Sequence, residues 1–591
     1  MSTSNEMIAS VGKNIQEKTT LIWNIADTLR GPFKPHEYGL VIIPMTVIKR
    51  FHDCLLDTWD AVVETNKEIG HLAVKDGFLR AAAQHEFYNT SKYTFEKLKA
   101  DPENIEDNFQ DFLNGFSDNV TEILAHMDFQ AQVKRMTEAG ILYQVIVEFC
   151  SPKAYMGIDK VSTVDMGYIF EELVRKFSES YDEEAGAHFT SRDIIYLMCD
   201  LLVTNDPQVF DGKPKTVYDM TMGTSQMLTC MKERLLQMDS EMDVLTYGQE
   251  VNPFTAGIAQ ADDLIHGGDA KNMVLADTLS DDRFGSFKFS YTISNPPFGV
   301  DWKKEAPQVE AEFKKGEAGR FAPGLPPKSD GQLLFMLNGI SKLKPNGRMA
   351  IIQNGSSLFS GDAGSGQSEI RRYIIENDWL DAIIQIGTGS FYNTGIATYI
   401  WLISKDRDAS HAGRVQLIDA SGCSVARRKN IGNKRVDITD ACRDLIVQVY
   451  GDYKEGTFTA AAEDGSEVVV KSKIMDSVSL GYNKITVESP LLDEKGQPVL
   501  KKDKPVADTS KRDTETVPLD QDVDDYFKRE VLPYNAGAWI DVSKTKVGYE
   551  IPFTRVFYEY KELEPADVIA DRIRIYEKRL MDKLDTLFGE E

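Results

Sequence analysis

Apolar residues recur at helical spacing through the first 160 residues of this 591-residue chain. One such stretch covers residues 21–29 and another covers residues 40–55, and Gly31-Pro32 lies between them. Steps of three and four residues predict amphipathic helices, and a glycine followed by a proline interrupts them. The pattern predicts an N-terminal helical domain over residues 1–160 that packs on the rest of the chain.

Between residues 161 and 410 the pattern changes to short apolar runs that alternate with helical segments. The runs predict strands over residues 216–219, 244–250, 272–275, 287–294, 348–353, 382–386 and 399–404, with a helix over 226–238 after the first. This alternation predicts an α/β fold with a doubly wound, mostly parallel sheet. Ligands of such sheets bind beyond the carboxyl ends of the strands.

After residue 410 the periodicity weakens, and we interpret residues 411–591 as a C-terminal region. Residues 494–516 are charged and polar and predict a linker or flexible insertion. Residues 565–588 predict a terminal helix with a narrow apolar stripe, formed by Ile569, Ile573, Tyr576, Leu580, Leu584 and Leu587. The stripe fits packing within the chain and docking on a partner helix equally well.

The sequence Asn295-Pro296-Pro297-Phe298 directly follows the predicted strand over 287–294. Two prolines fix two φ angles and remove two backbone donors, which predicts a rigid loop with free carbonyl oxygens. The Asn295 amide oxygen and the Pro296 carbonyl can each accept one hydrogen of an exocyclic amino group, and an exposed Phe298 can stack on its ring. The two hydrogen bonds localise the nitrogen lone pair. Positioning against an electrophilic methyl group then supplies most of the remaining rate. A strand that simply ends in a turn is the alternative interpretation.

Three more predicted strand ends carry groups suited to a nucleoside. Asp219 ends the first strand, and a turn of small residues follows it, where the backbone can approach a ligand closely: Thr221, Met222, Gly223, Thr224 and Ser225. Glu250 ends the second strand, where an acid can accept ribose hydroxyls. Asp277 follows the third, where it can accept a hydrogen from adenine. Each acid alone also fits a helix N-cap, but their shared register predicts a binding site.

Together with these acids, Asn295-Pro296-Pro297-Phe298 resembles the amino-methyltransferases that use S-adenosylmethionine. Residues 186–192 resemble their cofactor-covering Phe-Thr-Pro-Arg segment, in the order of the gamma DNA adenine enzymes. Residues 30–35 and 391–396 narrow the resemblance to the modification subunit of type I restriction–modification systems. Ser191 departs from the family proline, and Met220 and Ser225 replace the proline and second glycine of its first cofactor loop.

The resemblance implies a Rossmann-like S-adenosylmethionine-dependent methyltransferase domain over residues 161–410, with the helical domain before it and a helical extension after it. It implies transfer of a methyl group to N6 of a flipped-out adenine in double-stranded DNA. Asn295, Pro296, Pro297 and Phe298 would position the base. The cofactor residues would be Ala187, His188, Phe189, Thr190, Ser191, Arg192, Asp219, Thr221, Met222, Gly223, Thr224, Ser225, Glu250 and Asp277.

Net charge bears on how this chain would meet DNA. The formal net charge is −26, whereas proteins that hold DNA alone usually present a basic face. Residues 299–330, which follow Phe298, form a long loop in which lysines and arginines give local positive charge among acidic residues. The resemblance implies three protein partners: a specificity subunit, a second copy of the modification subunit, and the restriction subunit of the full complex.

Two rival functions fit parts of the same sequence. A protein-glutamine methyltransferase uses the same amide-binding loop, but the chain length, the helical domain and the Gly-Ile-Ala turn near 395 argue against it. A catalytically inactive scaffold is disfavoured by the intact Asn-Pro-Pro-Phe loop. The sequence has no run of eighteen apolar residues, no secretory leader and no Cys or His cluster. These features predict a cytoplasmic protein with no membrane span and no metal.

Overall fold

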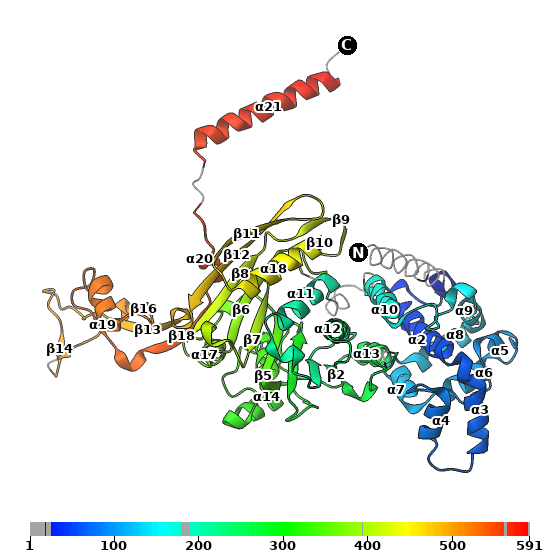
Figure 1. Cartoon of the computed structure of the whole chain (residues 1–591). Helices are drawn as coiled ribbons and strands as arrows, with labels where there is room; N and C mark the ends of the chain where they lie inside the picture. The colour runs from blue at the N-terminus through cyan, green and yellow to red at the C-terminus, as the bar shows by residue number, and fades with distance from the viewer. Residues whose placement is uncertain are drawn as a thin grey trace. The chain divides into compact units, whose positions relative to one another are not determined.

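The computed structural model describes Lys18 and residues 25–178, 190–265, 267–392, 394–502, 504–560 and 564–588 (Figure 1). Ala187, His188 and Phe189, three of the predicted cofactor residues, lie outside the described residues. The chain divides into two compact units, Met1–Ile551 and Pro552–Glu591.

The N-terminal region is helical, as the periodicity predicts. Its helices enclose an aromatic core that includes Phe51, Phe109 and Phe112. The segment 30–35 packs on α8, where Arg135 lies over the Phe33 ring. Arg135 also forms an ion pair with Glu37, just after this segment, at 2.9 Å. The helices are α2 (Gly39–Leu55), α3 (Trp59–Glu68), α4 (Asp76–Ala83), α5 (Phe95–Lys99), α6 (Ile105–Asn114), α7 (Asp118–His126), α8 (Phe129–Glu138), α9 (Leu142–Phe149) and α10 (Thr163–Ser178).

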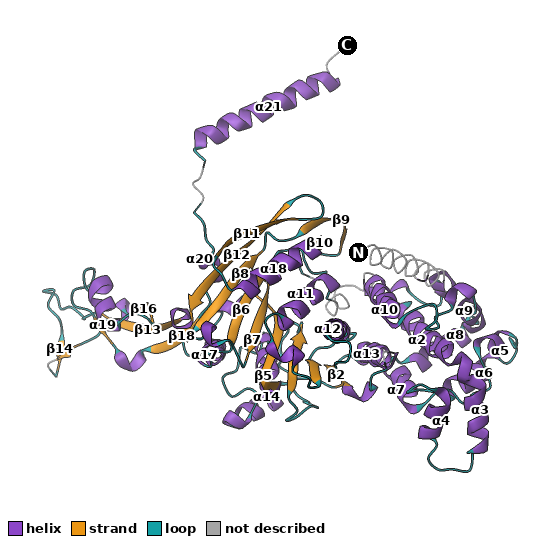
Figure 2. Cartoon of the chain, in the orientation of Figure 1, coloured by secondary structure: helices purple, strands orange, loops and turns teal. Residues whose placement is uncertain are grey.

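Ten strands of the described chain form one mixed sheet (Figure 2). In spatial order they are β11 (Gly456–Ala461), β12 (Glu467–Asp476), β8 (Arg414–Ala420), β6 (Leu380–Ile386), β7 (Thr398–Ser404), β5 (Leu343–Asn354), β4 (Phe289–Ser294), β1 (Lys215–Asp219), β2 (Val244–Glu250) and β3 (Met273–Leu275). Strands β3, β2, β1, β4 and β5 pair in parallel, and β7 runs antiparallel between β5 and β6. All seven predicted strands are confirmed, and the chain order reverses between β1 and β4, the position where such sheets bind ligands.

The sheet continues beyond residue 410, the domain boundary predicted from the sequence. β8 pairs in parallel with β6, and β12 and β11 extend the sheet in antiparallel fashion. The boundary at 410 therefore separates strands of a single sheet. The sequence missed β11 because many of its side chains are exposed and show no strong apolar alternation.

The segment 494–516, predicted as a linker, contains strands. β14 (Leu500–Lys501) and β15 (Lys504–Pro505) form a hairpin, and β16 (Asp513–Pro518) pairs with β13 (Gly481–Glu488). β13 also pairs with β17 (Trp539–Ile540) and β18 (Lys546–Tyr549). The sequence did not predict β14 and β15 because each is only two residues long and exposed, which leaves no apolar alternation to detect.

Helices cover both faces of the large sheet. Alternate residues of β5 point to opposite faces, and Ala350 and Ile352 share one apolar cluster with α11 (Arg192–Val203), α12 (Gln226–Met238) and α18 (Asp440–Asp452). Their neighbour Met349 lies against Gly339 of α15 (Gln332–Lys342), which packs beside α17 (Gly366–Glu376). The helix predicted over 226–238 is confirmed as α12.

The helix α13 (Pro253–Ile265) links the sheet to the helical domain. Ile258, Ala261, Leu264 and Ile265 belong to the apolar core of that domain. Gly257 permits the close approach of α13 to α7, since a Cβ atom there would lie 2.9 Å from Met127 Cγ. One helix therefore serves both the core of the N-terminal domain and the wall beside β2.

The second unit contains α21 (Ala566–Phe588), which confirms the predicted terminal helix. Its apolar side chains are exposed, among them Ile569, Ile573, Tyr576, Leu580 and Leu584. No helix in the described part of the chain is long and apolar enough to cross a membrane.

Candidate active site at the switch point of the sheet

Asp219 ends β1 at the switch point and is almost completely buried. Its Oδ1 accepts hydrogen bonds from the Ser294 hydroxyl at 2.6 Å and from the Thr221 amide at 3.0 Å. Ser294 ends β4, so this contact ties together the two strands that flank the switch point. Burial is the main reason that the pKa of Asp219 rises to about 7, and the nearby Glu250 carboxylate raises it further.

The turn after Asp219 has the close backbone geometry that its small residues predict. Gly223 and Ser225 both adopt left-handed conformations, with φ values of 54° and 65°. Ser225 immediately precedes α12, so the first N–H groups of that helix lack helical partners beside the turn. The turn can therefore offer backbone donors to a ligand.

Glu250 lies next to this turn. One carboxylate oxygen accepts the Gly223 amide at 3.0 Å, and the other accepts the Asn252 amide at 2.8 Å. Each oxygen keeps a further lone pair for a ligand hydroxyl. Glu250 thus connects the end of β2 to the turn that follows β1, as the common register of the strand ends predicts.

Asp277 stabilises the turn after β3 by accepting hydrogen bonds from backbone amides of the same turn. Its Oδ1 accepts the amides of Leu279 and Ser280 at 2.7 and 3.0 Å. This is the capping role that any single acid at a strand end also fits. The second carboxylate oxygen is not engaged in these two contacts.

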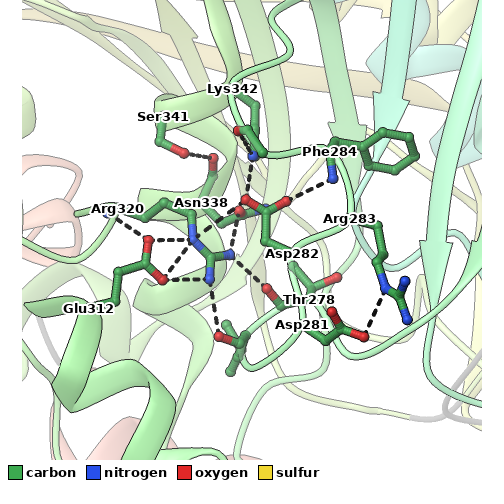
Figure 3. Close-up of polar contacts among 12 residues, drawn as sticks. Thr278, Asp281, Asp282, Arg283, Phe284, Glu312, Arg320, Asn338, Ser341 and Lys342 are labelled. Atoms are coloured by element: carbon green, nitrogen blue, oxygen red, sulfur yellow. Dashed lines mark hydrogen bonds and ion pairs between the residues drawn. The ribbon is translucent and has the colours of Figure 1, made fainter. Parts of the chain in front are cut away.

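Arg320 contacts Thr278 in the turn after β3 (Figure 3). It donates to the carbonyl oxygens of Thr278 and Leu279 at 2.7 and 3.1 Å, and it pairs with Glu312 of α14 (Ala306–Phe313) at 2.7 Å. The Thr278 hydroxyl in turn donates to the Met220 carbonyl at 2.5 Å. The loop after Phe298 therefore braces the turn after β3, and Thr278 links that turn to the one after β1.

Asn295 follows β4, and only one end of its side-chain amide is hydrogen-bonded to other residues that the structure describes. Its amide nitrogen donates to the Thr190 hydroxyl at 2.8 Å. Its amide oxygen is buried and has no hydrogen-bond partner among the described residues. An unsatisfied buried acceptor is costly unless a ligand completes it, so the oxygen is ready to receive an external N–H.

The residues after Asn295 differ in exposure. Pro296 is buried, Pro297 is exposed, and Phe298 is half-buried against the apolar cluster shared by the sheet and α11. The sequence predicted an exposed ring at Phe298, and that expectation is wrong in this structure. The apolar cluster draws the ring inward, which a strand-end motif does not reveal.

A pocket that opens to solvent lies between these groups. Its lining includes seven predicted residues: Thr190, Asp219, Thr221, Met222, Gly223, Thr224 and Asn295. Ile195, Gln226 and Met227 complete the lining and were not predicted. Glu250 and Asp277 lie at neighbouring strand ends outside the lining.

The segment before α11 divides between the pocket and the helix. Ser191 stands at the helix N-cap with φ −70° and ψ 147°, values that a proline also adopts, so the departure from the family residue preserves the backbone path. Arg192 turns toward Tyr168, over whose ring it lies at 3.7 Å, and does not line the pocket. Thr190 is the part of this segment that reaches Asn295.

Two supporting residues escaped sequence reasoning. Ser294 appeared only as the end of a strand, and Arg320 appeared only as one of several cations in a loop. For Ser294 the available signal was the alternation of side chains along β4, which fixes the face of the sheet on which Ser294 lies. No signal in the sequence pairs Arg320 with turns forty residues earlier.

The donors and acceptors at this site fit an adenosine-bearing cation. Asp219 and Glu250 supply carboxylates, the turn after β1 supplies amides, and the Asn295 oxygen remains available for a substrate. In the described part of the chain, no group of three or more His, Cys, Asp or Glu residues is placed to hold a metal ion.

Comparison with known families decides the assignment. The model for N-6 DNA methylases matches residues 162–482, and the model for the HsdM N-terminal domain matches residues 19–149. The chain belongs to the N-6 DNA methylase family. The S-adenosylmethionine-dependent methyltransferase fold and the S-adenosylmethionine cofactor expected from the sequence are confirmed, as is the resemblance to type I modification subunits.

Curated relatives of this methylase are subunits of type I restriction enzymes. It is 24% identical over 436 residues to the MjaIX methylase subunit of Methanocaldococcus jannaschii, covering 69% of this chain and 74% of the relative. It is 28% identical to the MpnII methylase subunit of Mycoplasma pneumoniae, covering 46% of this chain and 49% of the relative.

Solved structures share the fold of this methylase. The type I methyltransferase subunit from Streptococcus thermophilus matches with a TM-score of 0.61 and 22% identity, over 79% of this chain and 97% of that one. The modification subunit of a putative type I enzyme from Vibrio vulnificus matches with a TM-score of 0.51 and 14% identity, over 87% and 98%.

Proposed function

We propose that this methylase transfers a methyl group to N6 of a flipped-out adenine in double-stranded DNA, as the modification subunit of a type I restriction–modification complex. The observation that carries the proposal is the buried Asn295 amide oxygen, which has no partner among the residues that the structure describes, while Thr190 holds the amide nitrogen of the same side chain. An exocyclic amino group has the donor that this oxygen lacks. Membership of the N-6 DNA methylase family supports adenine as the base.

The cofactor would bind along the turns at the strand ends. Glu250 would accept the ribose hydroxyls, Asp277 would accept a hydrogen from the cofactor adenine, and the turn around Gly223 would supply amides. Asp219 and Thr190, which line the pocket, would lie near the methionine end. When bound, S-adenosylmethionine supplies an electrophilic methyl group on a positively charged sulfur.

The Asn295–Pro296 loop would prepare the adenine nitrogen for attack. The Asn295 oxygen and the Pro296 carbonyl accept the two amino hydrogens, which draws the nitrogen toward tetrahedral geometry and localises its lone pair. Pro297 stiffens the loop, and Thr190 fixes the rotation of the amide. Phe298 would stack on the base after a side-chain rotation, because its ring is half-buried in this structure. Positioning of this kind supplies much of the rate in methyl transfer.

The chain would act within an assembly in the cytoplasm. Its net charge of −26 disfavours tight binding of DNA by the chain alone. The exposed apolar side chains of α21 suit a helix of a specificity subunit, with a second modification subunit and a restriction subunit in the full complex. The similar proteins from Methanocaldococcus jannaschii and Mycoplasma pneumoniae are methylase subunits of type I restriction enzymes, which supports this arrangement.

Methylation of DNA by the chain together with its specificity subunit tests the proposal. Unmethylated genomic DNA is treated with labelled S-adenosylmethionine, and the nucleosides are resolved by mass spectrometry. We expect N6-methyladenine from the wild type and a near-complete loss with Asn295→Ala, while the dissociation constant for the cofactor changes little. Label on C5 or N4 of cytosine, or full activity of the Asn295 variant, would overturn the proposal.

The rival functions predict other results in the same assay. A protein-glutamine methyltransferase would label a glutamine peptide and leave DNA unlabelled. A scaffold would bind no S-adenosylmethionine in a calorimetric titration of the isolated chain. Either result in place of labelled adenine would assign the chain to that rival class.

A further inference from the structure

A short hairpin concentrates positive charge in this acidic chain. β9 (Val425–Ile431) and β10 (Lys434–Asp437) form an antiparallel pair with Gly432 in a left-handed turn at φ 53°. The thirteen residues 425–437 contain five basic and one acidic side chain, a net charge of +4, whereas the whole chain carries −26. The sign of this local charge is opposite to that of the whole chain.

Three cations of the hairpin are free for an external anion. Arg428, Lys429 and Arg435 are exposed, and none has an ion-pair partner within the part of the chain that the structure describes. Arg427 differs, because it pairs with Asp437 inside the hairpin. The hairpin therefore presents uncompensated charge to solvent.

The loop after Phe298 is a weaker candidate for the same role. Residues 299–330 contain six basic and six acidic residues, so their net charge is zero. Arg320 pairs with Glu312, Lys328 with Glu310 and Lys303 with Asp301. The positive charge that the sequence suggested for this loop is largely neutralised, and the β9–β10 hairpin is the better docking surface for an anion.

A buried ion pair holds the hairpin in place. The Lys434 side chain is 1% exposed, and its ammonium donates to Asp193 of α11 at 2.8 Å and to the Ser390 carbonyl at 3.0 Å. The same Asp193 carboxylate accepts the amide of Ile438, just after β10. Backbone bonds from Asn433 to Tyr392 and from Arg435 to Gly389 complete the attachment. The exposed cations thus project from a fixed base.

The point where the hairpin is attached lies at the same edge of the sheet as the candidate active site. β6 and β8 are parallel, and β6 shares its direction with β5 and β4 through the antiparallel β7 between them. The loop 387–392 and β9 therefore start at the edge where Asn295 follows β4. Asp193, which holds Lys434, is three residues after Thr190, which holds Asn295.

We propose that the β9–β10 hairpin binds the phosphate backbone of DNA beside the pocket that receives the target base, through Arg428, Lys429 and Arg435. The inference rests on the proposed function, because it requires DNA as the substrate. Phosphate contacts of this kind fix the position of a protein on the duplex without reading sequence. The hairpin would supply a local basic surface on a chain whose overall net charge is −26.

The salt dependence of DNA binding tests the hairpin. The triple variant Arg428→Ala, Lys429→Ala, Arg435→Ala is compared with the wild type, each with its specificity subunit, by fluorescence anisotropy on a labelled duplex of arbitrary sequence. Each lost phosphate contact lowers the slope of log affinity against log salt by about 0.9. We expect a slope smaller by roughly 2–3 and at least tenfold weaker binding at low salt, with unchanged affinity for S-adenosylmethionine.

A matched control removes the same charge elsewhere. Lys501→Ala, Lys502→Ala, Lys504→Ala takes three exposed lysines from the β14–β15 hairpin. We expect this control to keep nearly the wild-type slope. Equal slopes for the wild type and the β9–β10 variant, or an equal loss in the control, would overturn the inference while methylation by the wild type upholds the proposed function. A wild-type assembly that neither binds nor methylates DNA overturns both.

Discussion

The Thr190 hydroxyl accepts a hydrogen bond from the Asn295 amide nitrogen at 2.8 Å, across 105 residues of sequence. The contact joins the segment before α11 to the loop after β4. It fixes which end of the amide faces the pocket, because the nitrogen is engaged and the oxygen has no partner in the described part of the chain. Thr190 is therefore a positioning residue for the amide that would meet the target amine.

Replacement of Thr190 tests this positioning. Thr190→Val keeps the shape of the side chain and removes the acceptor, and a net hydrogen bond contributes roughly 0.5–1.5 kcal/mol. We expect kcat to fall about three- to tenfold, because the Asn295 amide can then rotate. Thr190→Ser keeps the hydroxyl and serves as the control, with kcat near that of the wild type. Equal rates for the valine and serine variants would remove Thr190 from this role.

Glu250→Ala should weaken the binding of S-adenosylmethionine about tenfold or more, since hydrogen bonds to a charged group contribute roughly 1.5–3 kcal/mol. Isothermal calorimetry on the isolated chain measures the change. Because Glu250 also holds the Gly223 amide, a 2′-deoxyribose analogue of the cofactor separates the two effects. The wild type should discriminate against the analogue and the variant should not. Retained discrimination by the variant would place the ribose elsewhere.

Binding of S-adenosylmethionine should strengthen as pH rises through 7. Burial raises the pKa of Asp219 to about 7, so its carboxyl is protonated and neutral below that value and charged above it. Only the charged form attracts a cationic cofactor. Asp219→Asn keeps an oxygen for the Ser294 and Thr221 donors and should flatten the pH dependence between about 6 and 8. Calorimetry checks this, with S-adenosylhomocysteine, which lacks the positive charge on sulfur, as the ligand control.

Arg320→Lys should lower cofactor affinity more than it lowers kcat. Lysine keeps the charge, but its ammonium cannot reproduce the planar fork that reaches Glu312 and the carbonyls of Thr278 and Leu279. The Asp277 turn would lose support and the Asn295 loop would not. Arg320→Ala should also lower the free energy of unfolding by about 3–5 kcal/mol, because Glu312 loses its partner. A fall in kcat with unchanged cofactor affinity would contradict this assignment.

Deletion of residues 565–591 should weaken assembly with the specificity subunit and preserve cofactor binding. The apolar side chains of α21 that would meet a partner helix, among them Ile573 and Leu580, are exposed. Size-exclusion chromatography measures assembly, and calorimetry measures cofactor affinity. Ile573→Asp with Leu580→Asp changes the stripe alone, and we expect it to reproduce the deletion. Wild-type assembly by both forms would exclude α21 as a docking helix.

Sequence reasoning located the fold and the strand ends well, since apolar periodicity and strand order are local signals. It placed Asp219, Gly223 and Asn295 at one pocket because parallel strands end at one edge. It failed for Arg320, whose partners lie in turns distant in sequence. It also failed for Phe298, since packing on the apolar cluster decides the exposure of that ring. It missed β11, whose side chains are mostly exposed and lack strong apolar alternation.

Gly257 sets a limit on how this chain can be divided. At that residue α13 approaches α7 so closely that a single added carbon would meet Met127 and the Ile123 carbonyl. Truncation near residue 160 would expose Ile258, Leu264 and Ile265 to solvent on the catalytic fragment. The two domains are therefore not interchangeable modules. A chimaera that exchanges the helical domain must carry over the matching surface of α7, so recombination between relatives would preserve the pair as one inherited block.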